Sequence, residues 1–189
     1  PQDCHHGRDA THNDDSDGHA GFSFTKLVEF GSPLVDQSVD YATTPWSCVR
    51  DNVTGLVWEV KTTDGGIHDM DNTYRWGGVT HKGNYGTAFY DDWDSLVNGS
   101  NSENLCGFND WSVPTTQQLM SIMDNSRIKP ALDTNYFPNT PPTRAFWSAS
   151  PSTRHSLYAW HVSTNSGSSS SNYRNRYLSV RLVRSFSAK

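Results

Sequence analysis

One stretch of the chain combines the side chains that proteins use for recognition. Residues 152–177 contain eight Ser, three Asn, three Arg and three Tyr among 26 positions. Tyr offers a large and rigid contact area, Arg offers forked hydrogen-bond donors, and Ser and Asn offer adaptable hydrogen bonds, as in antibody combining sites. A flexible Ser-rich surface loop is the alternative interpretation of this composition. Because the aromatic and Arg residues are interleaved with small polar ones between strand-like segments, we favour a contact surface.

The candidate ligand-binding residues are the cationic, aromatic, imidazole, amide and hydroxyl side chains of this stretch. They are Arg154, His155, Tyr158, His161, Ser163, Asn165, Ser169, Asn172, Tyr173, Arg174, Asn175, Arg176 and Tyr177. No acidic residue lies among them, so the stretch would attract carboxylates, sulfates or phosphates. We therefore expect the partner to be a protein or an anionic glycan.

Two clusters of potential metal ligands are less specific. Asp64, Asp69 and Asp71 lie in a Gly-containing loop that could hold Ca²⁺ with backbone carbonyls, although solvated turn residues explain them as well. Residues 13–18 begin like a calcium loop, but Phe occupies the position of the final Glu. Near the N-terminus, Cys4 and four His residues lack the paired spacing of a zinc finger. We predict no metal site, and Ca²⁺ is the one cofactor left open.

The cysteines favour a structural role. None of Cys4, Cys48 and Cys106 lies in a C-x-x-C pair, which excludes a redox dithiol and a four-cysteine zinc site. In an oxidising compartment Cys48 and Cys106 would be the natural disulfide pair, because both flank apolar, Trp-bearing segments, but sequence alone leaves the connectivity open. The chain has no G-x-S-x-G elbow, no H-E-x-x-H and no phosphate-binding Gly loop. We expect no enzyme activity, with a Cys–His pair formed on folding as the alternative.

Composition and charge narrow the class of protein. The 189 residues suit one domain, and no run of about 18 apolar residues could span a bilayer. The net charge of −5 argues against nucleic-acid binding. All 20 acidic and eight of the 15 basic residues lie at or before Asp133, whereas the remainder carries seven basic residues and no acid. A composition rich in Ser and Asn and poor in Lys indicates an exported protein, located outside the cell or on a bacterial outer surface.

Periodicity in the sequence predicts an α+β domain with antiparallel sheets. Strand-like runs cover residues 21–27, 55–62, 145–150, 157–164 and 177–184. The run at 55–62 alternates as a half-buried strand does, and in the last run Leu178, Val180 and Leu182 share one face while Ser179, Arg181 and Val183 share the other. We expect residues 1–45 to form an N-terminal arm packed on a domain of residues 46–189, as one globular unit.

Two helices are expected between these strands. In residues 87–98, Phe89, Trp93, Leu96 and Val97 have helical spacing, with Asp91 and Asp92 in the first turn. A second helix follows Pro114, with Thr115 and Gln118 as a capping box. The expected core residues are Trp58, Trp93, Trp111, Leu119 and Leu182.

Several segments resemble, in the same order, the Lcl C-terminal domain family, which is typified by the C-terminal domain of a bacterial collagen-like adhesin. The segments are WSCVRDNVTGLVWEVKT (46–62), GGIHDMDNTYRW (65–76), LCGFNDWSVPTTQQLMSIMD (105–124), NYFPNT (135–140), FWSASP (146–151) and VRLVR (180–184). The resemblance implies a C-type-lectin-like fold of the formylglycine-generating-enzyme subtype, with two helices packed on short antiparallel sheets. It also implies a ligand-binding or adhesion domain.

The resemblance bears on catalysis and on the polar stretch. The segment VPTTQQL (113–119) is similar to one in formylglycine-generating enzymes, but their catalytic cysteine pair has no counterpart here, so that activity is the alternative function. The sugar-binding signature of calcium-dependent lectins is also absent. On this fold, targets of diversity-generating retroelements carry their variable region where residues 152–177 lie, and mutated Asn codons give Ser, Tyr, His, Arg and Thr. The resemblance therefore implies a variable protein of this kind, with a sulfated-glycan adhesin without diversification as an alternative.

Overall fold

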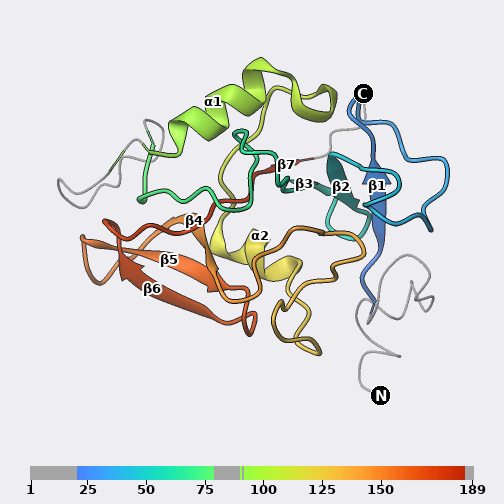
Figure 1. The fold of residues 1–189 in the computed structure, drawn as a ribbon. Helices are drawn as coiled ribbons and strands as arrows, with labels where there is room; N and C mark the ends of the chain where they lie inside the picture. Colours follow the sequence, from blue (N-terminus) through green and yellow to red (C-terminus); the bar gives the residue numbers. More distant parts are fainter. Residues whose placement is uncertain (1–20, 79–89, 91, 186–189) are drawn as a thin grey trace.

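The computed structural model describes residues 21–78, 90 and 92–185, and these form two small antiparallel sheets (Figure 1). The first sheet has the strand order β1-β2-β3-β7, and the second has the order β4-β5-β6. The strands are β1 (Phe24–Leu27), β2 (Cys48–Asp51), β3 (Leu56–Glu59), β4 (Ala145–Pro151), β5 (Tyr158–Ser163), β6 (Ser169–Tyr173) and β7 (Val183–Ser185). The helical elements are α1 (Asp94–Ser102), the 3₁₀ turn η4 (Leu105–Gly107) and α2 (Thr116–Ser121). The mixed α+β class predicted from the sequence is confirmed.

The first sheet is built from three antiparallel pairings, the last of which joins β3 to β7. Strand β1 pairs with β2, and β2 pairs with β3 through a turn that the side chain of Asp51 organises. Asp51 Oδ1 accepts hydrogen bonds from the backbone N–H groups of Val53 and Thr54, at 2.9 and 3.2 Å. Gly55 closes the turn with φ +69°, a conformation that favours glycine.

Part of the expected N-terminal arm belongs to this sheet. Residues 24–27 form an edge strand, and the rings of Phe22 and Phe24 stack with centroids 5.5 Å apart inside the core. Residues 21–45 therefore contribute to the same hydrophobic core as the rest of the domain. The clusters expected at residues 4–19 lie outside the described residues.

Helix α2 begins at the predicted capping box. Thr115 accepts a hydrogen bond from the backbone N–H of Gln118, whose side chain accepts one from the backbone N–H of Thr115. The helix places Leu119 in the core, fully buried, and packs on β4 and β5. Figure 1 shows α2 at the centre of the molecule, between the two sheets.

Helix α1 begins later than the sequence predicts. It covers Asp94–Ser102, whereas Phe89 and Asp91 lie outside the described residues. Asp92 precedes the helix and pairs with Arg75, with Nε and Oδ2 2.7 Å apart, instead of occupying the first turn. The expected burial of Leu96 is confirmed, because this residue packs beside Trp93 in the core.

The predictions for the strand-like runs 55–62 and 177–184 need correction, because other segments of the chain cover both faces of each run. All four residues of β3 are buried, and Lys61 beyond it is 2% exposed, so this run is not half-buried. Of residues 177–184, only the last two belong to a sheet strand. Leu178 forms a bridge to Tyr74, and Ser179 forms a parallel bridge to Phe146 of β4. The segment thus leaves the second sheet and enters the first at β7, and it is buried from Ser179 to Arg184.

The core contains every residue predicted for it. Trp58, Trp93, Trp111, Leu119 and Leu182 are each at most 2% exposed. The expected disulfide is present: Cys48 of β2 is bonded to Cys106 of η4, across 58 residues of chain. Closing a loop of that length reduces the entropy of the unfolded chain, which corresponds to about 4 kcal/mol of stabilisation in the chain-entropy model.

The burial of Leu119 leads to a stability prediction. Leu119→Ala should lower the free energy of unfolding by about 2–5 kcal/mol, because it removes buried contacts in the core where α2 packs on the second sheet. Gln117→Ala, at an exposed position of the same helix, should change it by less than about 0.5 kcal/mol. Urea denaturation of both variants checks this. Equal effects of the two substitutions would show that α2 does not present this face to the core.

Candidate ligand-binding surface

The Ser-rich stretch folds into a β-hairpin. Strands β5 and β6 pair antiparallel, with Tyr158 opposite Tyr173, Trp160 opposite Ser171 and Val162 opposite Ser169. β5 also pairs with β4, so β6 is the outer strand of this sheet (Figure 1). The alternative interpretation as a flexible loop is therefore wrong for residues 158–173.

The hairpin turn is fixed by close packing. Gly167 adopts φ +70°, and a side chain there would lie 3.3 Å from Met123 Cβ and 3.5 Å from Ala131 Cβ. The backbone N–H of Ala131 donates to the carbonyl of Thr164 at 2.7 Å. The turn is thus joined to the segment that follows α2, which holds the hairpin in place.

One face of the hairpin carries exposed aromatic side chains. We call Tyr158, Trp160, Ser169, Ser171 and Tyr173 the hairpin surface, because alternation along the paired strands places them on one side. The rings of Tyr158 and Tyr173 lie 4.2 Å apart, and Tyr173 is 48% and Trp160 38% exposed. This surface combines large aromatic area with small hydroxyl groups.

The opposite face of the hairpin borders a groove. Its volume is about 510 Å³. The hairpin contributes His161, Ser163 and Asn172 to it, and the remaining walls come from Thr73, Thr143, Arg144, Ala145, Tyr177, Leu178 and Ser179. Hydrogen bonds in both directions between the backbones of Tyr74 and Leu178 bring the first of these segments beside the last. We call this the groove.

The structure thus divides the predicted site residues among several places. Tyr158, Ser169 and Tyr173 belong to the hairpin surface, and His161, Ser163, Asn172 and Tyr177 belong to the groove. The loop before β5, the hairpin turn and the turn after β6 carry the exposed residues Arg154, His155, Asn165, Asn175 and Arg176. The His155 ring lies 5.4 Å from that of Tyr158, so this loop extends the hairpin surface.

The prediction that Arg174 contacts the ligand needs correction, because its side chain points into the protein. It is 1% exposed, its guanidinium lies 4.3 Å from the centroid of the Trp76 ring, and its Nε donates to the carbonyl of Tyr158 at 3.2 Å. The backbone carbonyl of Arg174 accepts a hydrogen bond from the N–H of Trp76. Burial lowers the pKa of this guanidinium. Arg174 therefore supports the hairpin from below and does not belong to the exposed surface.

Much of the positive charge in the C-terminal part is neutralised by acids from earlier in the chain. Arg144 pairs with Asp71 at 2.8 Å, and Arg184 pairs with Asp110 at 2.6 Å. Among the described residues, Arg154 and Arg176 are the exposed cations close to the hairpin surface. The expectation of an anionic ligand therefore depends on these two residues.

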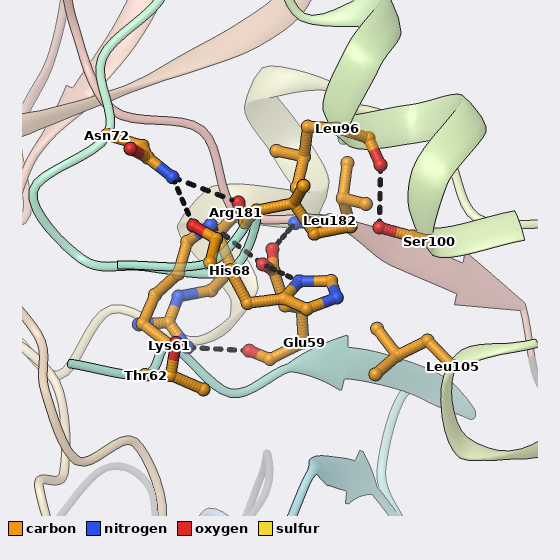
Figure 2. Close-up of polar contacts among 12 residues, drawn as sticks. Glu59, Lys61, Thr62, His68, Asn72, Leu96, Ser100, Leu105, Arg181 and Leu182 are labelled. Atoms are coloured by element: carbon orange, nitrogen blue, oxygen red, sulfur yellow. Dashed lines mark hydrogen bonds and ion pairs between the residues drawn. The ribbon is translucent and has the colours of Figure 1, made fainter. Parts of the chain in front are cut away.

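A second cluster of chemically capable residues lies inside the molecule (Figure 2). Glu59 is fully buried, and its Oε1 is 2.7 Å from Lys61 Nζ and 2.7 Å from His68 Nδ1. Its Oε2 accepts the backbone N–H of Leu182 at 2.7 Å, while Arg181 donates to the backbone carbonyl of Glu59. Each group is engaged with strands or loops of the chain itself, so this cluster joins elements together.

The cluster shifts the pKa of its acidic and imidazole groups. Burial alone would raise the pKa of Glu59, but Lys61 and His68 outweigh it and lower the value to about 2. Burial alone would lower the pKa of His68, but hydrogen bonds to Glu59 and Glu103 outweigh it and raise the value above 6.5. Because each ring nitrogen of His68 faces a carboxylate oxygen, the doubly protonated ring fits this position best.

Potential metal ligands and thiols are engaged elsewhere. Asp64 and Asp69 accept backbone N–H groups of their own loop, and Asp71 pairs with Arg144. In the described part of the chain, no group of three or more His, Cys, Asp or Glu side chains could hold a metal ion. Cys106 is bonded to Cys48, so it carries no free thiol while that bond is intact.

Sequence reasoning missed the groove walls and the buried cluster. Thr73, Thr143 and Arg144 lie outside residues 152–177, and the bridge between Tyr74 and Leu178 brings the first of them close. A signal for the buried cluster did exist. Arg181 shares its strand face with the apolar Val183, and an apolar neighbour on that face is compatible with a buried partner.

The buried and exposed arginines of the hairpin provide a matched pair of variants. Arg174→Ala should lower the free energy of unfolding by about 2 kcal/mol, because it removes the contact with Trp76 and the bond to Tyr158. Arg176→Ala should change it by less than about 0.5 kcal/mol. Thermal and urea unfolding of both variants measure this difference. If Arg174→Ala were as neutral as Arg176→Ala, its side chain would have to lie in solvent.

The buried cluster predicts how stability depends on pH. Because the folded state lowers the pKa of Glu59, this group stabilises the fold fully above about pH 4.5, and the contribution is lost as the pH falls toward 2. Because the folded state raises the pKa of His68, its contribution is complete below 6.5 and is lost as the pH rises through the raised pKa. His68→Gln should be less stable at pH 5.5 and should lack the decline on the alkaline side. Urea denaturation from about pH 3 to 9 measures both curves, and parallel curves would contradict the assignment.

Comparison with known proteins identifies a family for this chain. A family model described as the Lcl C-terminal domain matches residues 47–184, from just before β2 to the second residue of β7. No curated protein and no solved structure matches the chain. Within the described residues, no helix has the length and apolar character needed to cross a membrane. The match covers most of the chain, with the whole second sheet and, in the first sheet, β2, β3 and most of β7. The chain therefore belongs to the Lcl C-terminal domain family.

Proposed function

We propose that this protein is an adhesin-type domain that binds a ligand outside the bacterial cell through its hairpin surface and has no catalytic role. The observation that carries the proposal is the exposure of Trp160 and Tyr173, with the half-buried Tyr158 beside Tyr173, on one face of a rigid hairpin. Tyr and Trp are enriched among the residues that dominate binding energy at protein interfaces. Membership of the Lcl C-terminal domain family, with its adhesin-like surface proteins, supports the same class of function.

The rigidity of the hairpin favours binding. Gly167 packs against Met123 and Ala131 at the turn, and Arg174 is buried against Trp76 at the other end. A surface that is ordered before binding loses less conformational entropy when the ligand arrives. The hydroxyl groups of Ser169 and Ser171 can then adapt their hydrogen bonds to the partner.

Two finer proposals concern the subtype of the fold and the variability of the hairpin. The combination of two short sheets with α2 between them is compatible with a C-type-lectin-like fold of the formylglycine-generating-enzyme subtype. On that fold, we infer that the protein is a variable target of a diversity-generating retroelement. The exposed positions include Ser, Tyr and Arg, while the buried Ala159 and Val162 are apolar. Sequencing the gene in sibling isolates tests this, with differences expected at outward positions only.

A sulfated glycan is the second candidate ligand, and Arg154 and Arg176 favour it because they are exposed beside the hairpin surface. Arginine binds sulfate and carboxylate through paired donors. The formylglycine-type enzyme is a weaker alternative. Two of the three cysteines, Cys48 and Cys106, are bonded to each other, so neither supplies a free thiol while the bond is intact.

The experiment is an array that carries extracellular proteins, heparin and neutral glycans, probed with the purified protein. A triple variant, Tyr158→Ala, Trp160→Ala and Tyr173→Ala, should lose about tenfold or more of its affinity for the captured ligand, because the aromatic contacts are removed. Arg154→Ser with Arg176→Ser should weaken heparin binding, with a larger effect at low salt.

The control is Phe30→Ala with Val35→Ala, which removes two exposed apolar side chains elsewhere in the domain. Melting temperatures verify that each variant is folded. If the triple variant and the control bind every captured ligand as the wild type does, the hairpin surface is not the contact site.

A further inference from the structure

The groove on the far side of the hairpin has the volume of a small-ligand site. Its volume of about 510 Å³ lies within the range of about 300–1,000 Å³ that is typical of such sites. Three separate segments form its walls: the 73–74 loop, the start of β4 and the 177–179 segment, with β5 and β6 along one side. Because these segments are bonded to one another, the groove is formed before any ligand binds.

The groove lining carries little net charge. Among the described residues that line it, Arg144 is the one with a permanent charge, and this guanidinium pairs with Asp71 and donates to the carbonyl of Met70. Burial lowers the pKa of His161, so its ring is neutral at neutral pH. An anion would have to compete with Asp71 for Arg144, so the electrostatics do not favour an anionic ligand here.

The groove lining is instead rich in neutral hydrogen-bonding groups. Thr73, Thr143, Ser163 and Asn172 contribute hydroxyl and amide groups. Two further polar atoms, Ser179 Oγ and His161 Nδ1, are buried and have no hydrogen-bond partner among the described residues. A buried polar atom without a partner costs free energy, which a hydroxyl group near these atoms can recover.

An aromatic ring completes the lining. Tyr177 is 61% exposed, and the guanidinium of Arg75 lies 5.7 Å from its ring centroid. Arg75 is itself paired with Asp92, so it adds no uncompensated charge beside the ring. An exposed tyrosine beside several hydroxyl and amide groups offers an apolar ring face together with hydrogen-bonding groups. A saccharide matches both, because it has an apolar face and a rim of hydroxyl groups.

We propose that the groove is a second binding site, which takes a neutral saccharide unit with one sugar face against Tyr177 and its hydroxyl groups toward Asn172, Ser163 and His161. This site lies on the opposite side of the hairpin from Tyr158, Trp160 and Tyr173. The groove site therefore adds a separate ligand class to the proposed function. If the groove does not bind a saccharide, the proposal for the hairpin surface is unaffected.

The test is a titration of the ¹⁵N-labelled protein, followed by NMR, with methyl glycosides of glucose, galactose, mannose, fucose and N-acetylglucosamine. At least one of them should shift the amide signals of residues 161–163 and 177–179 in a saturable way. Tyr177→Ala and Asn172→Ala should each weaken this binding by about tenfold. Tyr177→Phe keeps the ring and should bind within about twofold of the wild type, which shows that the ring itself carries the contact.

Matched controls establish that the sugar binds in the groove. Phe30→Ala, which removes an exposed ring elsewhere, should leave the sugar affinity unchanged, and the spectrum of each variant verifies its fold. The proposal is overturned if none of the neutral glycosides shifts the groove signals at tens of millimolar. It is equally overturned if only a sulfated heparin disaccharide does so, or if both alanine variants bind as the wild type does. The triple variant of the hairpin surface should retain sugar binding even where it has lost the ligand captured on the array.

Discussion

A single buried carboxylate ties the main parts of this domain together. Glu59 is fully buried and has Lys61 and His68 at one oxygen and the backbone N–H of Leu182 at the other (Figure 2). An uncompensated charge in a protein interior costs several kcal/mol, so all three partners must be in position for the carboxylate to be buried. They come from the residues just after β3, from the loop that follows and from the C-terminal segment. The geometry around Glu59 therefore requires these three parts to assemble together.

This requirement extends from the first sheet to the hairpin. The segment that contains Leu182 bridges Phe146 of β4 through Ser179 and then enters the first sheet at Val183. Correct placement of this segment at Glu59 thus fixes the second sheet relative to the first. The hairpin is joined to the same framework at Gly167 and Arg174, so its outward side chains are presented without contributing to the core.

Local sequence signals predicted much of the fold. The capping box of Thr115 and Gln118 was visible because both residues act within one helical turn, and it is present in α2. The strand predicted at 157–164 is present as β5, and the pairing of Cys48 with Cys106 also agrees with the structure. The Ser-rich partner strand β6 was not predicted, because it has no apolar alternation. Signals of this kind depend on near neighbours or on broad apolar patterns, which a sequence contains directly.

The errors concern side chains whose environment is set by distant segments. Arg174 and Arg176 lie two positions apart in a polar stretch, yet one packs on Trp76 and the other is exposed. The alternation in 55–62 is typical of a half-buried strand, but Glu59 and Lys61 are covered by residues up to 123 positions away. The groove has the same origin, because its walls meet through the bridge between Tyr74 and Leu178. In each case the deciding contact is long-range and polar.

The most direct test of this account is the stability of a variant in which Ser169, Ser171, Tyr173, Asn175 and Arg176 are all replaced by other polar residues. If the framework around Glu59 is independent of the displayed side chains, urea denaturation should give a free energy of unfolding within about 1 kcal/mol of the wild type. A loss comparable to that expected for removing a buried leucine, about 2–5 kcal/mol, would contradict the separation of framework and surface.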